Sequence, residues 1–197
     1  LAALLAAWLA GADGGMVWWL ALFTAADNLL LLGFGAFLPR GVDAISDPQW
    51  RSKFEEVYDP TRLGVTFYAV AGAAEWEGRY DMFEGYGKSR PRFLVKQAPG
   101  ANFKVTSHGK TIEFFPIDTI KMSNSLKDAV GRTALRSVTQ ELAASKADWK
   151  IMFGYTPFRP AGSAVGAVRS EALNMQFSHR LEEFKVDLYI TGEERVL

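Results

Sequence analysis

The feature that most constrains this sequence is a recurrent pattern of short apolar segments, each followed at once by small and polar residues. Continuous apolar runs of this length are typical of β-strands that are buried on both faces. The pattern occurs at residues 17–23, 65–71, 149–153 and 186–190. If these strands lie parallel, their carboxyl ends meet at one edge of a sheet, where α/β proteins bind ligands. The four loops that follow the strands are therefore where a functional site is expected.

Between the apolar strands lie segments with the periodicity of helices, and one hairpin. Residues 47–58 begin with Asp47-Pro48, a favourable helix start, and repeat apolar side chains at helical spacing. Further helices are predicted at residues 133–144 and 170–184, and the two strands of a hairpin at residues 101–107 and 111–117. This alternation predicts an α/β or layered α+β fold. We expect a single domain over residues 1–197.

The first ten residues, LAALLAAWLA, are apolar, and Leu and Ala favour a helix. Gly11 and Asp13 interrupt the run after these ten residues, whereas a membrane-spanning helix needs roughly 20. We therefore expect a helix that packs on the core and no transmembrane span, with a signal-peptide segment as the alternative. Because the sequence begins at Leu1 rather than Met, we also expect further residues before it in the gene product.

Composition argues against several classes of function. The 22 basic and 22 acidic residues balance, so no net positive charge favours nucleic acid. The absence of Cys excludes disulfides and Cys-based zinc sites. The only two His are His108, in the predicted hairpin turn, and His179, in a predicted helix. Since neither follows an apolar strand, a metal centre with imidazole ligands is not expected at the strand ends, and we expect no cofactor.

Six short stretches, in order along the whole chain, resemble motifs of the purple acid phosphatases, which are calcineurin-like metallophosphoesterases. They read ADNLL (residues 26–30), DPQWRSKFEEVY (47–58), AGAAE (71–75), FFPIDT (114–119), QELAASKADWKI followed by GYTP (140–151 and 154–157), and VDLYITGEER (186–195). The resemblance implies a four-layer αββα sandwich of two mixed sheets. The first and last family segments find no counterpart, so the sandwich would be incomplete at both ends in this chain.

The departures from the family pattern fall on its chemistry, because such enzymes hold two metal ions with Asp, Asn and several His. Where the family has the ligand Asn and the catalytic His, this chain has Ala73 and Ala74. Tyr155 replaces the His before the central proline, and Glu193 and Arg195 replace the two terminal His. The resemblance thus implies a vestigial pocket, made of Asp27, Asn28, Ala73, Ala74, Glu75, Tyr155, Glu193 and Arg195.

Because of these substitutions, the resemblance implies that the chain has no catalytic residues. It implies instead a pseudoenzyme that serves as a structural or scaffold subunit among other protein subunits. Asp27 matches the family's bridging ligand and is the one weak metal candidate. If Glu75 and Glu193 are not metal ligands, we expect them to be surface or ion-paired carboxylates. We expect a structural role for Asp118 if hydrogen-bond donors lie near it.

Two alternatives remain open. One is an atypical metal-dependent phosphoesterase that uses Asp27, Glu75 and Glu193. The other is a phosphate-binding or anion-binding module beside Arg195. The sequence indicates no cellular location.

Overall fold

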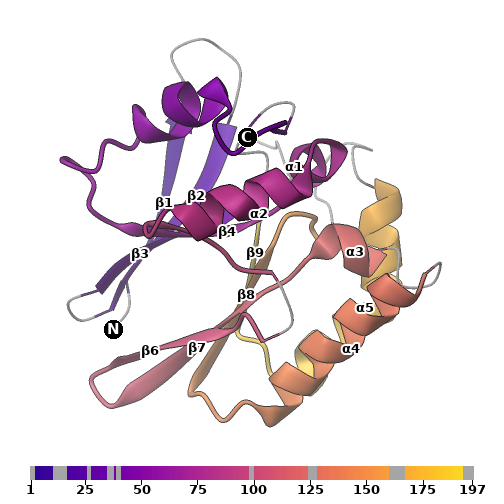
Figure 1. The fold of residues 1–197 in the computed structure, drawn as a ribbon. Helices are drawn as coiled ribbons and strands as arrows, with labels where there is room; N and C mark the ends of the chain where they lie inside the picture. Colours follow the sequence, from indigo (N-terminus) through magenta and orange to yellow (C-terminus); the bar gives the residue numbers. More distant parts are fainter. Residues whose placement is uncertain are drawn as a thin grey trace. The chain divides into compact units, whose positions relative to one another are not determined.

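The computed structural model describes residues 3–10, 17–25, 28–34, 38, 41–97, 100–123, 128–159 and 167–192. The chain divides into two compact units, Leu1–Val95 and Lys96–Leu197, and each contains one sheet (Figure 1). The mixture of strands and helices confirms the predicted α/β class, and none of the helices within the described ranges is long and apolar enough to cross a membrane. The single-domain assignment stays a prediction.

The amino-terminal unit contains a five-stranded sheet in the order β1-β2-β3-β4-β5. Its strands are β1 (Ala3–Ala10), β2 (Val17–Ala25), β3 (Asn28–Phe34), β4 (Thr66–Val70) and β5 (Phe93–Val95). The first three strands pair antiparallel, and β3, β4 and β5 pair parallel. Its helices are the π-helical segment η1 (Trp50–Glu55), α1 (Ala73–Glu77) and α2 (Tyr80–Ser89).

The prediction of a helix at residues 1–10 is wrong, because this segment forms β1. It pairs antiparallel along its length with β2, so that Trp8 lies opposite Trp19. Leu and Ala favour a helix by only fractions of a kcal/mol per residue, and isolated helices of about this length are marginal in water. Ladder hydrogen bonds to β2 therefore override the local preference. The helix start at Asp47 is confirmed, since its Oδ1 accepts from the Gln49 backbone N–H at 2.9 Å.

An aromatic cluster forms the core of this unit. The indole of Trp50 stacks on the ring of Tyr86 with centroids 3.6 Å apart, and Phe54 meets Phe67 and Phe93 edge-on. These side chains come from η1, α2, β4 and β5. Edge-to-face and stacked pairs stabilise a core beyond the area that they bury. The apolar side chains that recur at helical spacing in residues 47–58 therefore face the sheet, as the sequence pattern predicts.

The carboxyl-terminal unit contains a four-stranded sheet in the order β6-β7-β8-β9. The strands are β6 (Phe103–Ser107), β7 (Lys110–Pro116), β8 (Trp149–Gly154) and β9 (Leu188–Thr191), and the helices are α3 (Thr119–Ser123), α4 (Ala129–Ala144) and α5 (Ala167–Glu183). The predicted hairpin is confirmed: His108 and Gly109 both have positive φ, +50° and +74°, as a type I′ turn requires. Strands β7, β8 and β9 run parallel.

The three helices of this unit contribute to one apolar core with the sheet. Met122 of α3, Leu142 of α4 and Phe177 of α5 are buried together with Phe115 and Met152 of the central strands. The amino end of α4 is capped by Asp128, whose Oδ1 accepts from the Gly131 backbone N–H at 2.6 Å. This packing fixes where β7 and β8 end, and so it positions the loops that carry the candidate site.

Candidate functional site

Three parallel strands of the carboxyl-terminal unit end at one edge, as the apolar pattern predicts for β8 and β9. Gly154 lies opposite Thr191, and Pro116 opposite Phe153. The Gly192 backbone N–H donates to the carbonyl oxygen of Tyr155 at 3.3 Å. Tyr155 therefore lies beside the loop that begins at Gly192. Glu193 and Arg195, the next predicted pocket residues, lie outside the described residues.

Hydroxyl groups hold the backbone of the loop after β8. The Thr119 Oγ1 accepts from the Thr156 backbone N–H at 3.0 Å, and the Tyr189 hydroxyl donates to the Thr156 carbonyl oxygen at 2.6 Å. The Thr191 hydroxyl donates to the carbonyl oxygen of Tyr155. Each of these bonds joins a side chain to a main-chain atom. They position the strand-end loops, and the sequence reading missed them because they join residues more than 30 positions apart.

In the amino-terminal unit, Ala73, Ala74 and Glu75 begin α1, directly after β4. Glu75 is not a surface carboxylate, because this side chain is fully buried. Its Oε2 accepts from the Gly72 backbone N–H at 2.9 Å, and its Oε1 accepts from the Leu38 backbone N–H at 3.4 Å. Glu75 thus closes the helix amino terminus and holds the segment around Leu38. Both carboxylate oxygens are engaged with the main chain.

The strand register separates Asn28 from these residues. Asn28 begins β3, and Leu30 lies opposite Thr66, the first residue of β4. Asn28 is therefore at the amino-terminal end of β4, whereas α1 follows its carboxyl end. The six-residue step from Asn28 to Phe34, the partner of Val70, corresponds to about 20 Å of extended strand. The expectation that the loop after residues 17–23 shares an edge with the loop after β4 is wrong, because β2 runs antiparallel to β3.

Asp27 lies outside the described residues. The two histidines are both exposed, and neither follows the carboxyl end of β7, β8 or β9: His108 is in the turn between β6 and β7, and His179 is on α5. Within the described ranges, no group of three or more His, Cys, Asp or Glu side chains could hold a metal ion.

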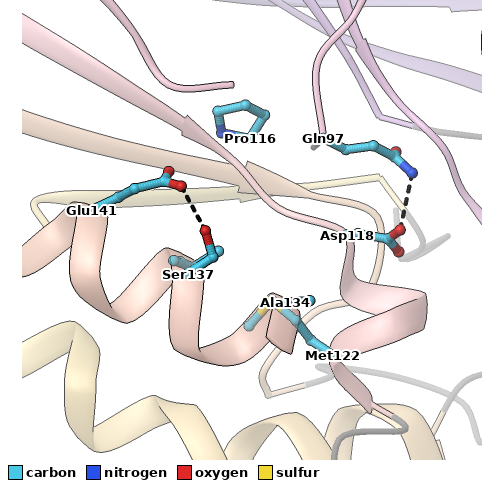
Figure 2. A pocket seen from close by; sticks show the side chains of 8 residues that line it. Gln97, Pro116, Asp118, Met122, Ala134, Ser137 and Glu141 are labelled. Carbon is cyan, nitrogen blue, oxygen red and sulfur yellow. Dashed lines mark hydrogen bonds between the residues drawn. The ribbon is translucent and has the colours of Figure 1, made fainter. Parts of the chain in front are cut away.

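A small cavity of about 20 Å³, room for one water molecule, lies in the carboxyl-terminal unit (Figure 2). It is lined by Gln97, Pro116, Asp118, Met122, Ala134, Ser137, Val138 and Glu141. Asp118 is 3% exposed, and its Oδ2 accepts from the Gln97 side-chain amide at 3.0 Å. Its Oδ1 accepts from the Lys121 backbone N–H at 3.0 Å. The Asp118 carboxylate therefore has the hydrogen-bond donors that the structural role expected for it requires.

Burial raises the pKa of Asp118 above the usual aspartate value of 3.8, and the hydrogen bonds and charge of Lys121 oppose this rise. A carboxyl whose pKa is raised on folding stabilises the fold fully below its unfolded pKa, and this stabilisation is lost as the pH rises through the folded pKa. We therefore expect the free energy of unfolding of the wild type to decline above about pH 4 as this carboxyl ionises, and we expect a smaller decline in Asp118→Asn, whose side chain stays neutral.

Urea unfolding of the wild type and the variant from pH 4 to pH 7 measures this effect. Asp81→Asn is the control in which the pH dependence of stability should change in the opposite direction. The hydrogen bond from Arg79 lowers the pKa of Asp81 instead of raising it. A decline between pH 4 and pH 7 that is as large in Asp118→Asn as in the wild type would show that ionisation of Asp118 does not lower the stability of the fold.

Three comparisons place the chain among known proteins. No protein-family model matches it. The chain is 25% identical over 186 residues to tartrate-resistant acid phosphatase type 5 of Sus scrofa, covering 87% of this chain and 54% of that protein. It is also 25% identical over 190 residues to glideosome-associated protein 50 of Plasmodium falciparum (isolate 3D7), covering 78% of this chain and 47% of that protein. The chain thus spans about half the length of the curated relatives it matches.

A solved structure, described as GAP50, the anchor in the inner membrane complex of Plasmodium, superposes with a TM-score of 0.71 at 23% identity. The match covers 84% of this chain and 55% of that structure. It confirms the expected mixed α/β fold with two sheets and helices.

Proposed function

Because the chain is a distant relative of the purple acid phosphatases, we propose that it is a catalytically inactive member of this group and a structural subunit of a larger protein assembly. The observation that carries the proposal is the likeness, in sequence and in fold, to glideosome-associated protein 50. That relative is described as an anchor in a membrane complex. The partners of this chain would accordingly be other protein subunits.

The chemistry of the strand-end residues supports the inactive assignment. The methyl groups of Ala73 and Ala74 offer no lone pair to a metal, and each oxygen of the Glu75 carboxylate already accepts a backbone hydrogen bond. A dinuclear phosphatase site must supply roughly four to six ligands to each ion. Imidazole ligands are not available to fill this need, because His108 and His179 are the only histidines and both lie elsewhere.

Metal analysis combined with an activity assay tests the inactive assignment. The purified protein is incubated with iron, zinc or manganese, desalted, and assayed for bound metal and for hydrolysis of p-nitrophenyl phosphate. We expect far less than one metal ion per chain and hydrolysis equal to the buffer blank. A full equivalent of metal together with turnover, both lost in Asp27→Ala, would overturn the proposal in favour of an atypical phosphoesterase.

Calorimetry with inorganic phosphate distinguishes the anion-binding alternative from the proposed scaffold role. Phosphate binding that is lost in Arg195→Ala would favour it over a scaffold.

The structural role is tested on the protein isolated from its source under native conditions. We expect it to elute with stoichiometric partner proteins, at a mass well above that of its own polypeptide measured under denaturing conditions. Elution of the endogenous protein as a free monomer at every salt concentration would contradict the subunit role. The two tests can fail separately. A monomer that binds no metal would contradict the subunit role, whereas the proposal that the protein is inactive would still hold.

A further inference from the structure

The small cavity of the carboxyl-terminal unit is large enough and polar enough to hold a bound molecule (Figure 2). Its volume of about 20 Å³ exceeds the roughly 10–15 Å³ in which one water molecule fits. Cavities of this kind with purely apolar walls stay empty, whereas those with polar groups hold water. Four of the eight lining residues here are polar: Gln97, Asp118, Ser137 and Glu141.

The polar groups of the wall already donate hydrogen bonds to one another. The side-chain amide of Gln97 donates to Oδ2 of Asp118 at 3.0 Å, and the hydroxyl of Ser137 donates to Oε1 of Glu141 at 2.9 Å (Figure 2). The hydroxyl hydrogen of Ser137 is thus in use, and an ionised carboxylate has none to give, so Asp118 and Ser137 can offer only lone pairs to the cavity. A molecule bound there must therefore supply hydrogen-bond donors.

The Asp118 carboxylate has room for a further donor. It is 3% exposed, so bulk water scarcely reaches it. Its Oδ1 accepts from the Lys121 backbone N–H at 3.0 Å. The Lys121 ammonium lies 3.5 Å from Oδ2, which is longer than the 2.7–3.2 Å typical of an N–H···O bond. Because a buried carboxylate loses its solvation, each additional donor that reaches it stabilises the folded state.

A water molecule fits this cavity better than a metal cation does. Ca²⁺ and Mg²⁺ take about six or more oxygen ligands. In the part of the chain that the structure describes, no group of three or more His, Cys, Asp or Glu side chains could hold a metal ion. The Lys121 ammonium beside Asp118 would also repel a cation. Water is neutral and carries two hydrogens to donate.

We propose that this cavity is a binding site for one water molecule, which donates one hydrogen to Asp118 and the other to the Ser137–Glu141 pair. The water thereby joins the turn that follows β7 to the helix α4. The next residue in this turn is Thr119, whose Oγ1 accepts from the Thr156 backbone N–H at 3.0 Å. The bound water therefore stabilises the turn that holds the loop after β8. The site does not depend on the proposed scaffold role.

A crystal structure of the wild-type protein, grown in rubidium chloride, tests the proposal without any substitution. We expect a water-sized density peak in the cavity, within about 3 Å of a carboxylate oxygen of Asp118. We expect no anomalous signal from rubidium at that peak. An empty cavity would overturn the proposal, and a rubidium peak would overturn it in favour of a cation site.

A pair of identical substitutions on α4 tests the water in solution. Ala134 lines the cavity, whereas Ala143 is exposed on the same helix. Relaxation dispersion of the ¹⁷O nucleus of water counts the long-lived waters of each variant. We expect Ala134→Val to lose one such water relative to the wild type, because its added methyl groups occupy the cavity, and Ala143→Val to lose none. An unchanged count in Ala134→Val would contradict the proposal.

Urea unfolding of the same two variants distinguishes a hydrated cavity from an empty one. Displacing a hydrogen-bonded water by an apolar group loses its bonds, whereas filling an empty cavity restores packing. We therefore expect the urea midpoint of Ala134→Val to lie below that of Ala143→Val. A midpoint above that of Ala143→Val would show that the cavity is empty in the wild type.

Discussion

Gly41→Ala is expected to lower the free energy of unfolding of the amino-terminal unit by about 3 kcal/mol or more. Gly41 has a φ of +66°, which costs an L-residue about 1–2 kcal/mol. A Cβ at this position would lie 2.5 Å from the Ala74 carbonyl oxygen and 2.8 Å from the Gly78 Cα. Both contacts are with main-chain atoms, which cannot rotate away as a side chain can. The loss would be a large part of the 5–15 kcal/mol typical of a folded domain.

Urea unfolding followed by tryptophan fluorescence measures this change. Gly109→Ala is the matched control, because Gly109 has a φ of +74° and nothing within 4 Å of the added Cβ. It should show the backbone cost alone, about 1–2 kcal/mol. If Gly41→Ala costs no more than Gly109→Ala, the close approach of the Gly41 segment to α1 is absent in solution.

Glu75→Ala is expected to destabilise the protein by about 2–4 kcal/mol, because it leaves the buried Gly72 and Leu38 backbone N–H groups without their acceptor. Most of the loss should come from Gly72, whose bond is the shorter. Glu75→Gln keeps one carbonyl oxygen and should cost about half as much.

The measurement is again urea unfolding, carried out in the presence of a metal chelator. Glu56→Ala serves as control: Glu56 is exposed and paired with Arg51 at 2.7 Å, so its loss should cost less than about 1 kcal/mol. The result also discriminates between functions. A metal ligand without its metal is a buried unneutralised charge, and its removal would leave stability unchanged or raise it. Stability equal to the wild type in Glu75→Ala would thus argue for the phosphoesterase alternative.

Much of the fold could be predicted because it follows from local patterns. The strand Trp149–Gly154 and the hairpin at His108-Gly109 appear where apolar runs and turn residues indicate them. The helix Ala129–Ala144 is also where predicted, although it begins four residues earlier, at the cap supplied by Asp128. In contrast, Ala3–Ala10 is a strand, and its composition gives no sign of the partner that decides this.

The candidate site was predictable only in part. The sequence correctly places Tyr155 beside the start of the Gly192 loop, because β8 and β9 are parallel neighbours. It wrongly expects the loop after residues 17–23, which includes Asn28, at the same edge as the loop after β4, because strand direction is not written in an apolar run. The buried roles of Glu75 and Asp118 depend on backbone donors that approach only in the folded chain. The pocket residues Asp27, Glu193 and Arg195 remain predictions.

What the sequence determined by itself is several local elements, among them the strand Trp149–Gly154 and the helix Ala129–Ala144, and a composition with two histidines and no cysteine. What only the tertiary structure decided is which strands pair and in which direction, and therefore which loops share an edge. The physical reason is that side-chain periodicity reports which faces of a segment are buried. Pairing and direction depend on backbone hydrogen bonds between distant residues, and every residue except proline offers the same donor and acceptor.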